Sequence, residues 1–227
     1  IAAARSAGYT AFKIRIGFGH DSDVRTTSSA ANGLEAGEQL FADANQNWDR
    51  EDAVAMAQAL SDTGLGWLEE PLPVDSPLAD WRAVAAASRM PIAGGENMRS
   101  EAEFSDAAAG DVFGIIQPDI CKWGGLSMCA AIARRIIASG KRYCPHYLGG
   151  GIGLMASAHL LSAAGGDGLL EIDVNDNALR ERLAGQLWPL NGGMAQVPHG
   201  PGLGFVPDMA GIAPMSVLHF DERIEAA

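Results

Sequence analysis

A repeated pattern of short apolar runs, each ending at an acidic residue or a histidine, constrains the fold of this chain more than any other feature. The steps between the terminal residues are 26, 27, 23, 27 and 25 residues, which matches one β-strand plus one helix. Because a (β/α) barrel brings the C-terminal ends of its parallel strands to one mouth, the period predicts that these side chains converge there. The six residues are Asp43, Glu69, Glu96, Asp119, His146 and Glu171.

Length and composition favour one α/β domain over residues 1–227. Barrels of this class commonly have about 250 residues, and the chain has 227, of which 48% are hydrophobic. We expect βα repeats over residues 1–187 and an irregular wrap over 188–227, because Gly and Pro are frequent from Trp188 to Pro214. The chain begins with Ile1 at what resembles the end of a helix, so we expect it to be part of a longer protein.

The net charge of −12 argues against a nucleic-acid or anionic-membrane partner, since both attract clustered Lys and Arg. No apolar stretch approaches the ~20 residues that a membrane helix needs. We therefore expect a cytoplasmic protein with a small-molecule partner, and a homo-oligomer. Cys121, Cys129 and Cys144 form no Cys-x-x-Cys pair, so they are expected to be buried free thiols in a reducing compartment.

Seven strands are expected from apolar or alternating runs that are bounded by turn residues. Helices are expected between them, including a short one at residues 30–39 and one opened by a capping box of Ser100 and Glu103. The expected strands are Tyr9 to Ile16, Leu40 to Asn45, Trp67 to Glu70, Pro91 to Ala93, Gly114 to Gln117, Arg142 to Pro145 and Leu169 to Ile172.

Two cations share one face of the first expected strand. Lys13 and Arg15 alternate with apolar residues, so both side chains point the same way. On an edge strand they would be solvated, whereas a mouth rich in carboxylates would attract them. The following polar segment, Gly17 to Gly33, is expected to be mostly loop, with His20 exposed in it.

The first three acidic residues indicate a metal site. Carboxylates on three successive strand ends repel one another unless they bind protons or a cation. Mg²⁺ prefers such oxygen ligands and keeps positions open for water or substrate, while no Cys/His cluster favours zinc. The alternative is that Asp43, Glu69 and Glu96 each form a separate structural ion pair.

Asp119 and His146 end neighbouring strands, so a hydrogen bond between them is expected. A carboxylate orients the imidazole and raises its basicity, which suits proton abstraction, although structural pairs of this kind also exist. No Gly-x-Ser-x-Gly elbow supports a serine hydrolase. The turn Gly149 to Gly153 suggests phosphate binding only weakly, because it has neither the P-loop Lys nor a dinucleotide spacing.

The ordered motifs FKIRIG, DANQNWD, WLEEP, GGEN, PDICKWGG, PH and LEID resemble the barrel domain of the enolase superfamily, in its mandelate racemase branch. The resemblance extends from about Gly8 to Pro207. It implies a modified TIM barrel, (β/α)7β, with the N-terminal capping domain and the first part of the barrel absent from this chain.

The resemblance also implies roles for the mouth residues. Mg²⁺ would be held by Asp43, Glu69 and Glu96, with Asn45 and Glu70 behind them. Together with Lys13, the metal would neutralise a substrate carboxylate while a base removes the α-proton. Asp119 and His146 would form the base, and Glu171 would stabilise the intermediate or donate a proton.

One residue departs from the family pattern. The branch typically has Lys-x-Lys on this strand, with the second Lys acting as a base, and here that position is Arg15. Arginine keeps its proton because its pKa exceeds ~12. We therefore expect dehydration of a monocarboxylate sugar acid to its 2-keto-3-deoxy product, with Arg15 steadying hydroxyl or carboxylate groups.

Three alternatives remain at this point. A racemase or epimerase of a 2-hydroxy acid would need a second base other than a charged Arg15. A Schiff-base aldolase using Lys13 or Lys122 would leave the carboxylates unexplained. A non-catalytic barrel would keep the same residues as ion pairs and bind ligands without turning them over.

Overall fold

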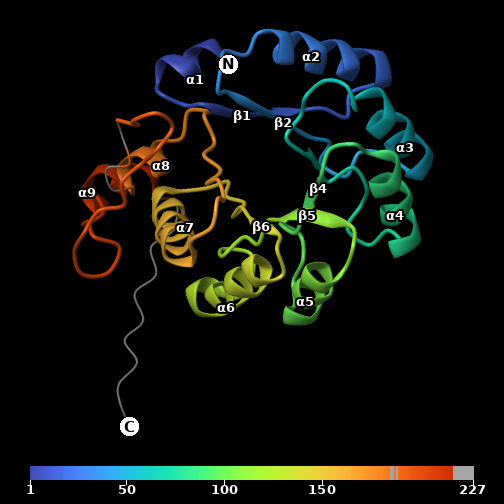
Figure 1. Ribbon diagram of the computed structural model, residues 1–227. Helices are drawn as coiled ribbons and strands as arrows, with labels where there is room; N and C mark the ends of the chain where they lie inside the picture. The colour runs from blue at the N-terminus through green and yellow to red at the C-terminus, as the bar shows by residue number, and fades with distance from the viewer. Residues whose placement is uncertain (185–186, 188, 217–227) are drawn as a thin grey trace.

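The computed structural model describes residues 1–184, 187 and 189–216. Six parallel strands form one sheet in the order β1-β2-β3-β4-β5-β6, so each strand lies beside the next one in the chain. The sheet curls around a central axis and the helices lie outside it, giving a partial barrel (Figure 1). The elements are α1 Ala2–Ser6, β1 Ala11–Arg15, α2 His20–Asn32, β2 Gln39–Asp43, α3 Arg50–Ala59, β3 Leu68–Glu69, α4 Leu78–Ala87, β4 Ile92–Gly94, α5 Glu101–Ala109, β5 Phe113–Ile116, α6 Gly125–Ala138, β6 Arg142–Tyr143, α7 Gly151–Ala164, α8 Ala178–Arg182, α9 Met209–Ile212 and the 3-10 turn η1 Ala213–Met215.

The strand register aligns the first functional residues in one row. Arg15 on β1 lies opposite Asp43 on β2, which lies opposite Glu69 on β3. Beyond the strands, backbone hydrogen bonds continue the same alignment, since the Ala44 N–H donates to the Glu69 carbonyl and the Gln117 N–H to the Gly94 carbonyl. The carboxyl ends of neighbouring strands therefore lie level with one another, and the expected convergence at one mouth is confirmed.

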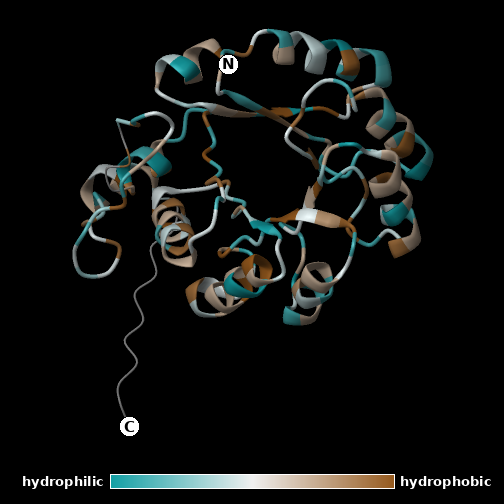
Figure 2. Cartoon of the chain, viewed as in Figure 1, coloured by the Kyte–Doolittle hydropathy of each residue, from teal (hydrophilic) through white to brown (hydrophobic). Residues whose placement is uncertain are grey.

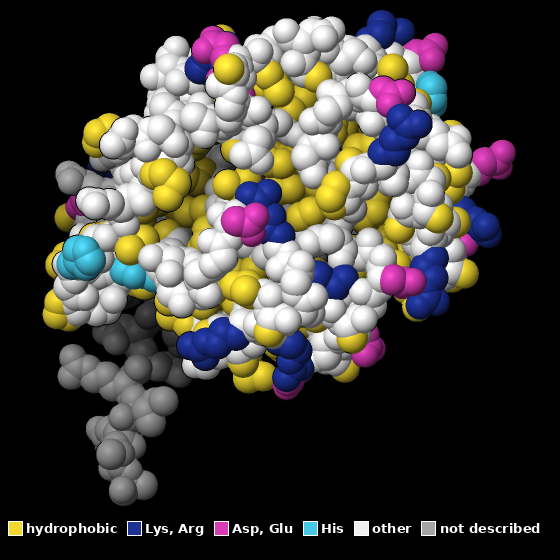
Figure 3. All heavy atoms as spheres, in the orientation of Figure 1, with side chains coloured by type: hydrophobic (Ala, Val, Ile, Leu, Met, Phe, Trp, Pro, Cys, Tyr) yellow, Lys and Arg dark blue, Asp and Glu magenta, His cyan; other side chains and the backbone are white. Residues whose placement is uncertain are grey.

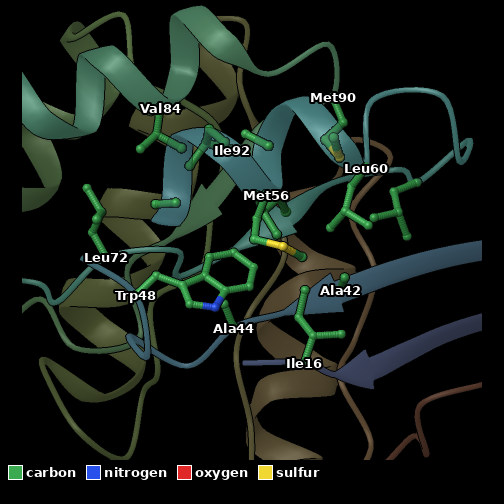
Figure 4. Packing of buried hydrophobic residues seen from close by; sticks show 14 of the residues in the cluster. Ile16, Ala42, Ala44, Trp48, Met56, Leu60, Leu72, Val84, Met90 and Ile92 are labelled. Atoms are coloured by element: carbon green, nitrogen blue, oxygen red, sulfur yellow. The ribbon is translucent and has the colours of Figure 1, made fainter. Parts of the chain in front are cut away.

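Apolar packing on both faces of the sheet holds this arrangement. Outside the sheet, Met56 and Leu60 from the end of α3 pack with Val84 of α4 and Ile92 of β4 (Figure 4). Inside the curl, a separate cluster includes Phe41, Trp67 and Ile115 among its members. Hydrophilic residues colour the outward parts of helices such as α2 and α3 (Figure 2), as expected for amphipathic helices around a buried sheet.

The expected loop at Gly17 to Gly33 was wrong, because most of it forms α2. The carboxylate of Asp23 accepts the backbone N–H groups of Gly17, Phe18 and Gly19, which satisfies donors just before and at the helix start. Asp23 and Thr27 are buried. The helix expected at residues 30–39 is correspondingly absent, since α2 ends at Asn32 and a turn follows.

The expected seventh strand, Leu169 to Ile172, was also wrong. These residues have no strand assignment, and the Leu169 N–H donates to the Cys144 thiol instead of a carbonyl. β6 has only two residues, and Pro145 just beyond it has no N–H for a ladder. The segment still lies beside the sheet, because its side chains share a cavity with β1.

The chain after α7 is largely irregular where it is described, with the short helices α8 and α9 and the turn η1 inside it. α8 packs against α7 and against α9, and both short helices can be found by their labels in Figure 1. Trp188 and residues 217–227 of the expected wrap lie outside the described residues. The glycine-rich turn before α7 allows close packing, since a Cβ on Gly151 would lie 2.1 Å from the Ala184 nitrogen.

Two surface expectations have separate outcomes. All three cysteines are free, but Cys121 is exposed, contrary to expectation, because it lies in the turn that follows Asp119 at the mouth. Among the described residues, no helix has the length and apolarity to cross a membrane. On the face shown in Figure 3, basic and acidic side chains are interspersed.

Candidate active site

Lys13 connects the carboxylates of the mouth. Its Nζ lies 2.5 Å from Glu69 Oε1, 2.5 Å from Glu171 Oε1 and 3.9 Å from Asp43 Oδ2. Burial by itself lowers the pKa of Lys13, but the charges of Glu69, Glu171 and Asp43 outweigh it and raise this pKa above its ordinary value. Lys13 is therefore a fixed cation, and the solvated-edge alternative does not describe it.

Arg15 approaches the same row of carboxylates from a more exposed position. Its Nη2 lies 3.3 Å from Asp43 Oδ2, and 46% of its side chain remains accessible. Burial, followed by the charge of Glu69, raises the pKa of Asp43 to about 6, against the opposing charges of Lys13 and Arg15. Asp43 therefore holds a proton more readily than an exposed carboxyl group does, even with two cations nearby.

Glu69 is fully buried and has donors on both oxygens. Oε1 accepts from Lys13, while Oε2 accepts from the Trp67 indole Nε1–H at 3.0 Å and the Gln117 amide Nε2–H at 2.8 Å. Its carboxylate orientation is therefore defined by three side chains.

Glu96 follows β4 and lies between a lysine and the histidine. Lys122 Nζ is 2.8 Å from Oε1, and His146 Nε2 is 3.1 Å from Oε2. Burial raises the pKa of Glu96, but the charges of His146 and Lys122 and the hydrogen bond from Lys122 outweigh it, so the net shift is downward.

Asp119 and His146 form the expected hydrogen bond. His146 Nδ1 lies 2.8 Å from Asp119 Oδ2, and both residues are buried. Asp119 Oδ1 accepts the backbone N–H groups of Cys121 and Lys122, which fixes the carboxylate. Burial lowers the pKa of His146, but the bond to Asp119 and the charges of Glu171 and Glu96 raise it overall.

Glu171 lies between the base and the lysine, although its segment forms no strand. Its Oε1 contacts Lys13, its Oε2 lies 3.8 Å from His146 Nε2, and the Tyr147 N–H donates to it at 3.3 Å. These contacts place Glu171 between Lys13 and His146.

Unusual backbone geometry marks the ends of β2 and β3. Asn45, Gln46 and Glu70 are the non-glycine residues with positive φ in the described part of the chain. Such strain clusters at functional sites. Asn45 is exposed and its N–H donates to Asp43, whereas Glu70 is buried with its Oε1 bonded to Asn97.

Glu70 carries a second anomaly. Its Oε2 is buried without a hydrogen-bond partner among the described residues. Burial and then the charge of Glu96 raise the pKa of Glu70 to about 7. Glu70 therefore holds a proton more readily than an exposed carboxyl group does.

The carboxylates fit a hard divalent ion by chemistry, although their present contacts are ion pairs. Across the described residues, no three Asp, Glu, His or Cys side chains are placed to hold a metal ion as they lie. Lys13, Lys122 and His146 contact the carboxylate oxygens instead. The donor set is nevertheless oxygen-only, and carboxylates gathered at one mouth repel one another unless they bind protons or a cation.

A cavity of about 440 Å³ extends from the mouth into the bore. Lys13, Arg15, Asp43 and Glu171 line it, so it can hold a small anionic ligand beside fixed cations.

The sequence pattern did not identify Trp67, Gln117, Asn97 and Lys122 as contacts of the mouth carboxylates. A usable signal existed for two of them, because Trp67 precedes Glu69 by two residues and Gln117 precedes Asp119 by two, and residues two apart share a strand face. His20 needs no functional role, since it is exposed at the start of α2 beside Asp21.

A family model described as enolase C-terminal domain-like matches residues 1–211. Among curated proteins, the chain is 29% identical over 208 residues to D-galactarolactone cycloisomerase of Agrobacterium fabrum, covering 88% of this chain and 55% of that protein. It is 31% identical over 144 residues to L-talarate/galactarate dehydratase of Salmonella typhimurium, covering 63% of this chain and 36% of that one. The chain thus spans about half the length, or less, of these relatives.

Solved structures give the same relationship. The chain is 47% identical to a mandelate racemase/muconate lactonizing enzyme from Bordetella bronchiseptica, with a TM-score of 0.91, covering 95% of this chain and 60% of that one. A racemase from Streptomyces coelicolor, described with bound magnesium, is 25% identical with a TM-score of 0.82, covering 95% of this chain and 58% of that one. The overall architecture is therefore shared with complete enzymes.

Proposed function

The chain belongs to the enolase C-terminal domain-like family, and on that premise we propose that its site removes the proton α to the carboxylate of a sugar acid. The further step we propose is loss of the β-hydroxyl, which gives a 2-keto-3-deoxy acid. The names of relatives support this chemistry, since they include dehydratases and cycloisomerases of sugar acids.

His146 carries the proposal. With Nδ1–H donating to Asp119, Nε2 of the neutral ring directs its lone pair into the mouth, where Glu96, Glu171 and Lys13 lie. A histidine whose tautomer is fixed by a carboxylate is suited to take a proton from carbon. The α-proton is very weakly acidic, so the charge that develops must meet preorganised cations in a site shielded from water.

Mg²⁺ is the cofactor that the donor set fits best, and Asp43, Glu69 and Glu96 would hold it. When bound, it supplies positive charge for the substrate carboxylate and for the charge that develops on its oxygens. Lys13 supplies a second fixed charge from the protein itself. Because Lys13 now contacts Glu69 Oε1, binding of a cation there would leave Lys13 with Glu171 and the substrate.

Proton transfers in this scheme balance without a further reactant. His146 takes the α-proton and returns a proton to the departing β-hydroxyl, which leaves as water. The resulting enol loses its hydroxyl proton and gains one at C3, so the net change is loss of water. Glu171 lies 3.8 Å from His146 Nε2 and can donate or accept during this last step.

Arg15 favours dehydration over racemisation. A two-base racemase needs a neutral base on the face opposite the histidine, and arginine keeps its proton. The exposed Arg15 guanidinium instead suits hydrogen bonding to substrate hydroxyl or carboxylate groups.

The test is a screen of the full-length protein against a sugar-acid library with Mg²⁺ in D₂O, read by NMR. We expect a 2-keto product from at least one acid. The matched control is His20→Asn, on the exposed start of α2, which should react as the wild type does. Deuterium at the α-carbon or inversion without water loss would replace the dehydratase by a racemase or epimerase. No exchange and no product with any acid would sink α-proton abstraction as a whole.

A further inference from the structure

We propose that Trp67 and Gln117 are positioning residues that orient the Glu69 carboxylate, so that it meets a cation at the mouth with Oε1 alone. The proposal rests on the proposed function, because Glu69 is a ligand of Mg²⁺ only in that scheme. Trp67 and Gln117 both lie inside the bore, below the mouth, and neither side chain carries a charge.

The contacts are directional and dry. The Trp67 indole and the Gln117 amide both donate to Glu69 Oε2, at 3.0 and 2.8 Å, and the three side chains are each less than 5% exposed. Breaking either bond would leave a buried polar group unpaired, which is costly. Rotation of the carboxylate about its terminal torsion would break both bonds at once, so Oε1 stays directed toward Lys13.

The indole is held by its own packing. Its ring stacks on Phe41 with centroids 3.6 Å apart and an interplanar angle of 17°. Space for Phe41 exists only because residue 66 is glycine, since a Cβ there would lie 2.3 Å from Phe41 Cε1. The donor direction of Trp67 is therefore set by β2 and by the residue that precedes it.

The amide of Gln117 is oriented by Glu69 alone. Its Oε1 is buried with no hydrogen-bond partner among the described residues, so Nε2 is the group whose contact decides the side chain's position. A flipped amide would place its carbonyl oxygen against Glu69 Oε2, which is repulsive. The backbone N–H of Gln117 donates to the Gly94 carbonyl, so the side chain reaches Glu69 from a fixed point just after the end of β5.

Loss of one donor should weaken cation binding without removing a ligand. Partners that orient metal ligands typically contribute about 10–100-fold to metal affinity. The first experiment measures the Mg²⁺ dissociation constant of the full-length protein by titration calorimetry. Trp67→Phe keeps the ring but loses the N–H, and Gln117→Met keeps the length but loses the amide.

We expect each variant to bind Mg²⁺ about 10-fold more weakly than the wild type. The control is Tyr143→Phe, which removes a buried hydroxyl that has no partner among the described residues and should change the constant less than about twofold. Wild-type affinity in both Trp67→Phe and Gln117→Met would overturn the inference while leaving the proposed function intact. Absence of Mg²⁺ binding in the wild type would overturn both.

A second measurement reads the contact without metal. The indole proton of Trp67, assigned by its loss in Trp67→Phe, should resonate downfield because its acceptor is a carboxylate. In Glu69→Gln it should move upfield, while the indole signals of Trp81 and Trp123 stay in place. The unmoved signals of Trp81 and Trp123 show that Glu69→Gln is folded. An unchanged Trp67 signal in this folded variant would show that the indole does not bond to Glu69.

Discussion

His146 has a carboxylate on each side of its ring, and this geometry decides what the residue can do. Asp119 accepts a hydrogen bond from Nδ1–H, while the carboxylates of Glu96 and Glu171 face Nε2. The charges around Nε2 favour the protonated ring, whereas proton abstraction needs the neutral one. A cation that neutralises Glu96 would therefore favour the neutral ring that can accept a proton, which links metal binding to the proton transfer.

Replacing His146 by Asn tests this role. The amide can still donate to Asp119, but it cannot take a proton from carbon, so we expect turnover to fall by at least ~10²-fold. Mg²⁺ should still bind, because His146 is not a proposed ligand, and the dissociation constant should change only by the loss of the charge beside Glu96. The measurements are product formation and titration calorimetry on the same samples. Undiminished turnover in His146→Asn would remove this residue from the mechanism.

At the scale of elements, the start of α5 has the capping box that the sequence predicts, formed by Ser100 and Glu103. Ser100 Oγ accepts the Glu103 N–H, and the Glu103 carboxylate accepts the N–H of Arg99. Ser100→Ala should lower the free energy of unfolding by about 1 kcal/mol, the usual cost of losing such a cap. Urea unfolding measures it, with Ser29→Ala on the exposed side of α2 as a control that should stay near the wild type.

The ion pair between α1 and the turn before β2 gives a prediction about pH. Arg5 donates to both carboxylate oxygens of Glu38, and this bond, helped by the Glu35 N–H, lowers the pKa of Glu38 from 4.5 to about 2. A carboxylate with a lowered folded-state pKa stabilises the fold above its unfolded pKa and loses that effect as pH falls. Glu38→Gln should therefore melt below the wild type at pH 7.

This difference in melting temperature should shrink as pH falls from about 4.5 toward about 2, the interval between the unfolded and folded pKa values. Ser29→Ala, on the exposed side of α2, removes no titratable group and serves as the control. A difference that stays constant with pH would mean that charge on Glu38 does not stabilise the fold. High salt should reduce it, because the pair is near the surface.

Elements whose signals are local could be predicted from the sequence, and those decided by packing could not. The strand ends at Asp43 and Glu69 follow from a period that every βα unit repeats. α2 was missed because its polar sequence is made helical by Asp23, whose carboxylate satisfies three N–H groups. The strand at Leu169 to Ile172 was wrongly expected because apolar content does not reveal that its neighbour β6 ends at Tyr143, two residues before Pro145.

The residues of the candidate site also include some that the sequence predicted and some that it did not. The spacing identified the acidic residues, the histidine and the cations of β1, because their positions depend only on strand order. Trp67 and Gln117 were missed because the period of two, which places each on the strand face of the acidic residue that follows it, was not applied to them. No spacing shows that Gln117 reaches across the bore to Glu69. The roles of the residues at the mouth, including Mg²⁺ binding, remain predictions to be measured.

At the scale of the whole molecule, three strands contribute the proposed ligands, so cation binding should stabilise the entire sheet. A ligand that binds only the folded state at 100 times its dissociation constant adds about 2.7 kcal/mol. We expect Mg²⁺ to raise the melting temperature of the full-length protein and EDTA to reverse the rise. Glu69→Gln should lose most of this effect.

The same melting experiment separates the proposal from the non-catalytic barrel. If Asp43, Glu69 and Glu96 serve only as ion pairs with lysines, Mg²⁺ at low millimolar concentration will not shift the melting temperature. Titration with Na⁺ at matched ionic strength is the control for screening.

The missing side chain at Gly66 has a consequence for how such sequences can diverge. Because a Cβ there would overlap the Phe41 ring, a lineage cannot gain a side chain at position 66 while position 41 stays aromatic. The two positions should drift together, with a smaller residue at 41 appearing before or alongside any larger residue at 66. Trp67 would lose its stacking partner in such descendants, so a different hydrogen-bond donor beside Glu69 should accompany the exchange.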